Sequence, residues 1–154
     1  MSQALFYLLP ANPAADVSEQ VSLLACRLAQ QYFQQGQWLY LHCEDQAQAY
    51  QVDELLWQFE PNAFVPHNLK GEGPKNGAPV EIGFDRLGPN VRRPVLINLA
   101  TAVPTFAHNF SQILDFVAGD DVQKQQARER YRQYRAQGIA LNTQDLATQP
   151  INFV

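Results

Sequence analysis

The stretch ALFYLLPANPAADVSE, residues 4–19, decides the fold class. Its first six residues form a continuous apolar run, which is typical of a strand buried on both faces. Two prolines end the run, and Asp16 followed by Glu19 forms a variant of the capping box that starts a helix. Apolar residues then recur at helical spacing until Gly36, which is well placed to end that helix. A buried strand followed by an amphipathic helix is the first unit of an α/β domain.

The same alternation of strands and helices continues along the chain. Strands are expected at residues 38–43, 80–84, 95–99 and 112–117, and helices at residues 47–58, 106–110 and 120–136. The segment between Pro61 and Gly88 holds five glycines and four prolines, so it is predicted to be a long loop around one short strand. Residues 139–154 are expected to form an irregular tail. The pattern predicts a layered α/β domain.

Composition narrows the class of protein. The chain has 154 residues, the length of one domain, and 46% hydrophobic residues argue against wholesale disorder. A net charge of -4 argues against strong direct binding of nucleic acid. Two cysteines cannot form a disulfide scaffold, and neither a leader peptide nor a membrane-spanning run is seen. We therefore expect a cytoplasmic protein that does not bind membranes.

The sequence contains none of the common catalytic or cofactor-binding motifs that we tested. The Walker pattern and GxGxxG are both absent, and the nearest glycine cluster, residues 71–74, contains a glutamate and a proline. His42 and Cys43 lie together at a strand end, but neighbouring strand residues point to opposite faces, so they should diverge. The three histidines show no metal-ligand spacing. We expect no catalytic residues, no metal and no cofactor.

Two segments give more specific indications of a binding function. Large apolar residues gather between Trp57 and Gly73, where they either close over the core or form a protein-binding patch; the sequence leaves both readings open. In the last helix, five of the 11 Lys and Arg residues fall within 12 positions. At 100° per residue, a stripe about 60° wide contains Lys124, Arg128, Tyr131 and Arg135. That stripe is either a solvated face or a site for an anionic ligand with an apolar part: an acidic peptide end, a phosphate or single-stranded nucleic acid.

Several motifs resemble one family. FVPHNL-x-GEGP-x-x-GAPVEI lies at residues 64–82, KQ-x-ARERY-x-x-YR-x-x-G at 124–138 and LNT at 141–143. Together with FYLL at residues 6–9 and CED-x-x-x-AY at 43–50, they resemble the chi subunit of bacterial DNA polymerase III. The resemblance implies a three-layer Rossmann-like α/β domain over residues 1–143, with a mainly parallel sheet and no functional nucleotide-binding loop. Residues 144–154 lie outside it as an extension without an assigned role.

The resemblance also implies a function and partners. Chi subunits are non-catalytic accessory proteins of the replicase that pair with the psi subunit, which ties them to the clamp loader. They bind the acidic C-terminal tail of single-stranded DNA-binding protein and support primase displacement. They also pair with a helicase-like repair protein in place of psi.

Family positions match two sets of residues in this chain. The psi-binding set comprises Trp57, Phe64, Pro66 and His67. The tail-binding set comprises Lys124, Arg128, Tyr131, Arg132, Gly138, Leu141 and Asn142. Two departures stand out: Arg132 occupies a position where the family often has lysine, and Ile139 stands where the family sometimes has an aromatic residue. The competing hypotheses are a direct single-strand DNA-binding module and a cysteine or nucleotide-dependent enzyme.

Overall fold

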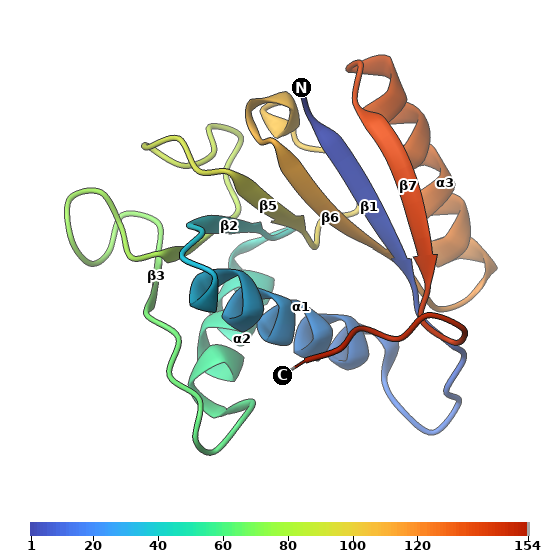
Figure 1. Cartoon of the computed structure of the whole chain (residues 1–154), viewed down its shortest axis with the longest axis horizontal. Helices are drawn as coiled ribbons and strands as arrows, with labels where there is room; N and C mark the ends of the chain where they lie inside the picture. The colour runs from blue at the N-terminus through green and yellow to red at the C-terminus, as the bar shows by residue number, and fades with distance from the viewer. Residues whose placement is uncertain (154) are drawn as a thin grey trace.

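The computed structural model describes residues 1–153 and contains a seven-stranded sheet with helices on both faces (Figure 1). The strands are β1 (Gln3–Leu8), β2 (Leu39–His42), β3 (His67–Leu69), β4 (Val80–Gly83), β5 (Val95–Asn98), β6 (Gln112–Val117) and β7 (Ala140–Asp145). Their order is β3-β4-β2-β5-β6-β1-β7, and every neighbouring pair is parallel. The three-layer Rossmann-like prediction is confirmed, with a sheet that is entirely rather than mainly parallel.

The helices are α1 (Val17–Gln34), α2 (Gln46–Gln58) and α3 (Asp121–Ala136), with a short 3-10 helix, η1 (Ala107–Asn109), before β6. Each long helix begins at an aspartate cap, and the first of these caps, Asp16, is one that the sequence predicts. The side chains of Asp16, Asp45 and Asp120 accept hydrogen bonds from backbone amides three residues later. In α3, Gln123 returns the bond to complete a capping box.

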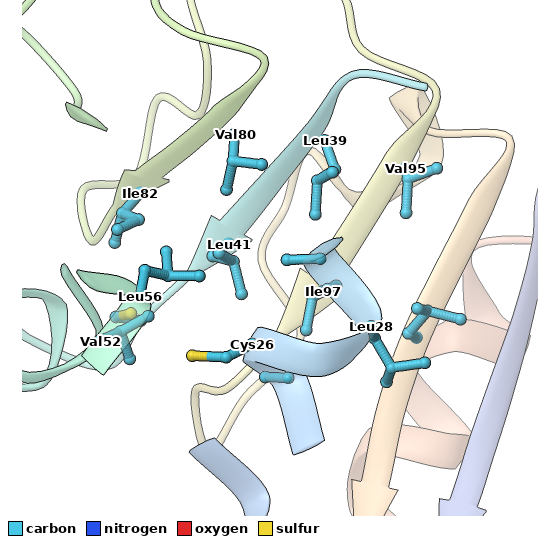
Figure 2. Packing of buried hydrophobic residues seen from close by; sticks show 14 of the residues in the cluster. Cys26, Leu28, Leu39, Leu41, Val52, Leu56, Val80, Ile82, Val95 and Ile97 are labelled. Atoms are coloured by element: carbon cyan, nitrogen blue, oxygen red, sulfur yellow. The ribbon is translucent and has the colours of Figure 1, made fainter. Parts of the chain in front are cut away.

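The two faces of the sheet bury different cores. Helices α1 and α2 cover one face, where Cys26, Leu28 and Leu56 pack onto strand residues such as Leu41 and Ile97 (Figure 2). Helices α3 and η1 cover the other, where the buried cluster contains Phe6, Tyr40 and Tyr134. Because Leu39 and Leu41 lie in the first core and Tyr40 in the second, β2 alternates between two apolar layers, as a strand of a buried parallel sheet does.

The prediction of an irregular tail from residue 139 is wrong for Ala140–Asp145, which form β7 at one edge of the sheet. Its sequence, ALNTQD, has no apolar run, and most of its side chains are exposed. These residues form a strand because β1 offers them a backbone ladder. The sequence also does not predict β3, a three-residue strand at the opposite edge, inside the glycine- and proline-rich segment.

The connection between β3 and β4 is ordered by buried polar side chains. The Arg93 guanidinium donates to the carbonyls of Asn76, Ala78 and Pro79. The Asn68 amide donates to two further carbonyls at the start of the same connection. The β3–β4 part of the predicted long loop is therefore held by side-chain hydrogen bonds where regular structure is missing.

The residues that follow β7 cross the face of the sheet that α1 and α2 cover. Leu146 and Ile151 pack against the core that α1 and α2 cover, and Gln31 Nε2 in α1 donates to the Asn152 carbonyl at 3.4 Å. The segment after β7 can be followed along α1 in Figure 1. Within residues 1–153, no helix is both long and apolar enough to cross a bilayer.

Candidate functional site

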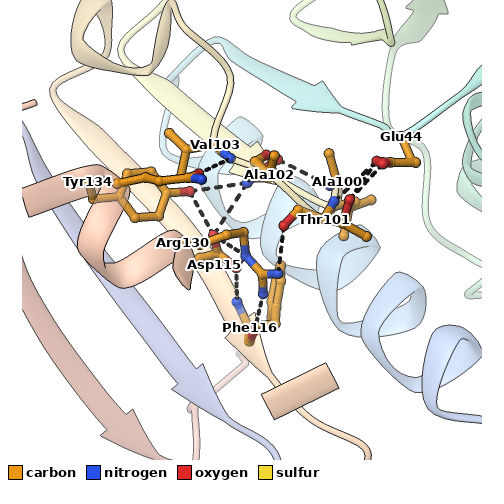
Figure 3. A network of polar contacts seen from close by, with 12 residues as sticks. Glu44, Ala100, Thr101, Ala102, Val103, Asp115, Phe116, Arg130 and Tyr134 are labelled. Atoms are coloured by element: carbon orange, nitrogen blue, oxygen red, sulfur yellow. Dashed lines mark hydrogen bonds and ion pairs between the residues drawn. The ribbon is translucent and has the colours of Figure 1, made fainter. Parts of the chain in front are cut away.

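The rotational setting of α3 is fixed by a buried polar network at its centre (Figure 3). Arg130 Nε donates to both carboxylate oxygens of Asp115 at 3.1 Å, and the Tyr134 hydroxyl donates to the same carboxylate at 2.6 Å. The remaining Arg130 nitrogens donate to the carbonyls of Thr101 and Phe116. Burial raises the pKa of Asp115, while the guanidinium of Arg130 and the hydrogen bond from Tyr134 oppose that rise. One arginine of the basic run therefore belongs to the core.

The opposite side of α3 forms the wall of a surface cleft of about 360 Å³. We call this the α3 cleft. It is lined by Phe6, Val117, Lys124, Ala127, Arg128, Tyr131, Arg132, Arg135 and Thr143. Four of these residues are basic, and all four are exposed. The stripe predicted from helical periodicity thus lies on one wall of a cavity whose remaining lining is largely apolar.

Tyr131 connects the charged rim of the α3 cleft to its apolar floor. Its ring lies 5.7 Å from the ring of Phe6, centroid to centroid, and the guanidinium of Arg135 lies 5.1 Å above it. Arg128 Nη1 donates to Gln125 Oε1, a neutral partner on the same helix. No carboxylate within residues 1–153 forms an ion pair with Lys124 or Arg128. An arriving anion meets two cations whose charge is not already offset.

Arg132 differs from its neighbours. Its Nη1 donates to Glu129 Oε2 at 3.1 Å, so the carboxylate that the helical wheel turns away from the stripe still reaches Arg132. Both side chains are more than half exposed, so this pair is worth little and can be exchanged for another anion.

The other predicted members of the tail-binding set lie near the α3 cleft but do not line it. Gly138 has a positive φ of 79° and ends α3. Leu141 is half-buried and packs, as Tyr131 does, against the core cluster that contains Phe6 and Tyr134. Asn142 pairs with Leu5 in the β1–β7 ladder. These three residues shape the strand and turn beside the cleft.

Sequence reasoning did not single out Phe6, Val117 or Thr143 as cleft residues. Phe6 and Val117 lie in runs that read only as buried strands, and Thr143 lies in a segment predicted to be irregular. Parallel register places Thr143 beside Phe6, so both side chains share the face that α3 covers. The strand order, which the sequence does not reveal, is the signal that would have found them.

The aromatic set forms a second surface, which we call the α2–β3 patch. Trp57 is 59% exposed and Phe64 is 67% exposed, with ring centroids 6.4 Å apart. Of the two readings left open, closure over the core is wrong for these two side chains. Tyr50, which is 49% exposed, lies two helical turns before Trp57 on α2 and was not singled out from the sequence.

His67 and Pro66 support this patch. The His67 ring lies 4.7 Å from the Trp57 ring, its side chain is fully buried, and its nitrogens lie 2.7 Å from the Val65 carbonyl and 3.1 Å from the Asp53 carbonyl. Pro66 is half-buried at the start of β3. His67 itself is therefore not part of the exposed surface, but it supports the exposed ring of Trp57 from below.

The two surfaces lie at opposite edges of the sheet. The α2–β3 patch adjoins β3, and the α3 cleft adjoins β7. Six strand spacings of about 4.8 Å separate these edges by roughly 29 Å along the sheet. The α2–β3 patch and the α3 cleft therefore share no residue.

The carboxyl ends of the strands, where open α/β sheets bind ligands, hold another cavity, of about 250 Å³. Its lining includes two carboxylates, Glu44 and Asp115, which disfavour phosphate. Arg130 also lines it, but its donors are already engaged by protein acceptors. This arrangement offers poor binding to a nucleotide.

His42 and Cys43 diverge as the sequence predicts. Cys43 lies in the core under α1 and α2, and burial raises the pKa of its thiol to about 12. His42 lies on the other face, with its ring 5.3 Å from Phe106, and burial lowers its pKa. The two side chains cannot act as a nucleophile and its base. Within residues 1–153, no group of His, Cys, Asp and Glu is placed to hold a metal ion.

Comparison with known proteins adds independent information. Residues 1–142 match the family described as "DNA polymerase III chi subunit, HolC". The chain is 45% identical to DNA polymerase III subunit chi of Escherichia coli strain K12 over 143 residues, which cover 93% of this chain and 97% of that protein. The subunit chi of Haemophilus influenzae strain Rd is 46% identical over 93% of this chain and 96% of its own length. That of Pseudomonas aeruginosa strain PAO1 is 39% identical over 92% and 94%.

Among solved structures, the chain resembles T4 UvsW, with a TM-score of 0.59 over 94% of this chain and 41% of that one. At 10% identity, this likeness concerns the fold alone.

Proposed function

This chain belongs to the DNA polymerase III chi subunit family, and on that premise we propose that it is a non-catalytic accessory subunit of the replicase which joins two partners. The α3 cleft receives the acidic C-terminal tail of single-stranded DNA-binding protein, and the α2–β3 patch binds the psi subunit, which links the protein to the clamp loader. Its action is cytoplasmic and supports DNA replication and primase displacement. A helicase-like repair protein can take the place of psi at the patch.

One observation carries the proposal for the tail: exposed cations stand over an apolar floor in the α3 cleft. Arg128 can hold a terminal carboxylate by two parallel hydrogen bonds, because its guanidinium is engaged only by a neutral amide. Tyr131 and Phe6 offer rings against which an apolar last side chain packs. Lys124 and Arg132 flank this position and attract the acidic peptide at longer range.

The exposed side chains of Trp57 and Phe64 support the proposal that the α2–β3 patch binds psi. Large aromatic side chains that are more than half exposed and adjacent are typical of interface anchors. The buried ring of His67 holds Trp57 from beneath, so the patch is organised before a partner arrives, which lowers the entropy lost on binding.

The runner-up is direct binding of single-stranded DNA along the same cations. Such proteins combine a basic groove with aromatic platforms on which bases stack. Here, within residues 1–153, Tyr131 is the one aromatic ring of the cleft that is not fully buried, so there is no series of platforms for successive bases, and the whole chain carries a net charge of -4. These features favour a short acidic ligand over a polyanion.

The deciding experiment is a titration of the protein with a synthetic acidic peptide that ends in phenylalanine and a free carboxylate. The matched control is the same peptide with a C-terminal amide, which removes one charge and the bidentate acceptor. We expect tight binding of the first, much weaker binding of the second, and affinity that falls as salt rises. Equal affinity for both peptides, or tighter binding of an oligonucleotide, would contradict the proposal.

A further inference from the structure

Strand β7 closes one edge of the sheet and leaves its outer backbone free. Within residues 1–153 it pairs with β1 alone. The amides of Ala140 and Leu146 both donate to carbonyls of the β1 segment. Because a parallel ladder alternates, residues of even number turn their backbone groups toward β1. Leu141 and Thr143 therefore direct their N–H and C=O groups outward.

This edge lacks the usual protections against pairing. Natural edge strands are blunted by lysine, proline, bulges or short length. β7 has six residues without Lys, Arg or Pro. Its one acidic residue, Asp145, ends the open run, because its carbonyl accepts from Thr148 and Gln149 in a turn. By contrast, β3 at the other edge has three residues and leads directly into Lys70.

The open edge continues into the α3 cleft. Thr143 belongs to both, since its side chain lines the cleft and its backbone faces outward. Leu141 packs into the same core cluster as Tyr131. Four basic side chains of α3 line the same cleft as Thr143, so the surroundings of the open backbone favour a segment that is extended and acidic.

We propose that the acidic peptide received by the α3 cleft adds to the sheet as an eighth strand along β7. This inference rests on the function proposed above and gives its binding mode. With the terminal carboxylate at Arg128, the preceding residues extend past Arg132 toward Arg135. Helix α3 connects two parallel strands and runs opposite to them, so the added strand is parallel to β7. Backbone hydrogen bonds then contribute affinity, and the cleft selects the last side chain.

Amide hydrogen exchange tests this on the unmodified full chain, with the free-carboxylate peptide as the probe. At saturation, exchange at Leu141 and Thr143 should slow by on the order of tenfold or more. Asn142 is the internal reference, because its amide faces β1. Unchanged exchange at both outward amides with the peptide bound would overturn the added strand. Slowing without peptide as the protein concentration rises would also overturn it, because a second copy would then occupy the edge.

A second measurement uses backbone N-methylation of the peptide, one position at a time. Methylation should weaken binding by about tenfold at alternate positions and leave the intervening ones unchanged, as a strand ladder requires. On the protein, Thr143→Pro removes one outward donor at an edge that tolerates proline, and Thr143→Ala controls for the side chain. The proline variant should bind more weakly than the alanine variant.

The outcomes separate the two proposals. If Arg128→Ala weakens binding but every methylated peptide binds equally well, strand addition fails and the function of the α3 cleft stands. If the unmodified peptide does not bind at all, both fail.

Discussion

Arg128 and Arg130 lie two positions apart on α3, and their guanidinium groups lie on opposite sides of the helix. Arg130 is 8% exposed and donates to Asp115 in the core, whereas Arg128 is exposed on the α3 cleft. The separation follows from helical geometry, which places the two residues about 160° apart. A run of basic residues is thus divided into one that sets the rotation of the helix and others that are free to bind.

Arg128→Ala should weaken binding of the acidic peptide by about 1.5–3 kcal/mol, the range for hydrogen bonds to charged groups. Arg92→Ala is the matched control, because Arg92 is an exposed arginine that does not line the α3 cleft. Calorimetric titration of both variants at equal salt measures the difference. Equal losses at the two positions would indicate diffuse charge attraction in place of a defined site.

Arg130→Ala should lower the free energy of unfolding by about 3–5 kcal/mol, because it leaves the Asp115 carboxylate buried without a counter-charge. Urea unfolding measures this loss. Replacing both partners with apolar residues, as in Arg130→Met with Asp115→Leu, should recover part of the stability. In variants that remain folded, Arg130→Ala should affect peptide affinity less than Arg128→Ala. A fully stable Arg130→Ala would contradict the structural role.

Phe64→Ala should leave the melting temperature nearly unchanged, because its side chain is 67% exposed and little packing is lost. Binding of psi should weaken by about 2 kcal/mol or more, as for an anchor at the centre of an interface. Leu87→Ala is the control, because Leu87 is 81% exposed outside the patch. A sharp fall in stability, with psi binding reduced only in proportion, would show that Phe64 is a core residue.

The extension after β7 should stabilise the domain without taking part in binding. Leu146→Ala combined with Ile151→Ala removes two side chains that pack against the core, so we expect a loss of about 1–3 kcal/mol. Thermal unfolding measures the loss, and peptide titration should give an unchanged affinity. If the double variant is as stable as the parent protein, the packing of Leu146 and Ile151 against the core adds nothing to stability.

His42 should make the protein less stable in mild acid. Burial lowers its pKa, while Glu44 and Asp85 oppose the shift, so the unfolded chain binds the proton more readily than the folded one. Stability therefore falls as the pH drops below about 6.5, the ordinary histidine value. His42→Phe keeps a ring beside Phe106 and should lose less stability between pH 7.5 and pH 5.5. If the variant instead loses more stability than the parent protein between these pH values, the predicted contribution of His42 is wrong.

Local pattern predicted much of the fold. The sequence shows the apolar stretches of β1, β2 and β5, the stretch of β6 that Asp115 interrupts, and the aspartate caps of the three long helices, because each depends on neighbouring residues. The alignment of Lys124, Arg128 and Tyr131 is equally local, since it needs only the helical period. The motifs that point to the family lie in the same segments.

The edges of the sheet were beyond that reasoning. β7 is polar and mostly exposed, and β3 is three residues long. Neither sequence therefore predicts a strand unless the neighbouring strand is known. Thr143 becomes a cleft residue only because β7 lies beside β1 and shares the face with Phe6. Strand order depends on contacts between residues far apart in the chain, which no local period encodes.

The sequence by itself determined the layered α/β class, the starts of the helices and which residues share a face of α3, because these follow from spacing along one segment. Only the tertiary structure decided which face is buried. The Asp115 carboxylate, carried by β6, engages Arg130 and leaves Arg128 on the surface. The exposure of Trp57 and Phe64 was decided in the same way, because it depends on what packs against them and not on their own polarity.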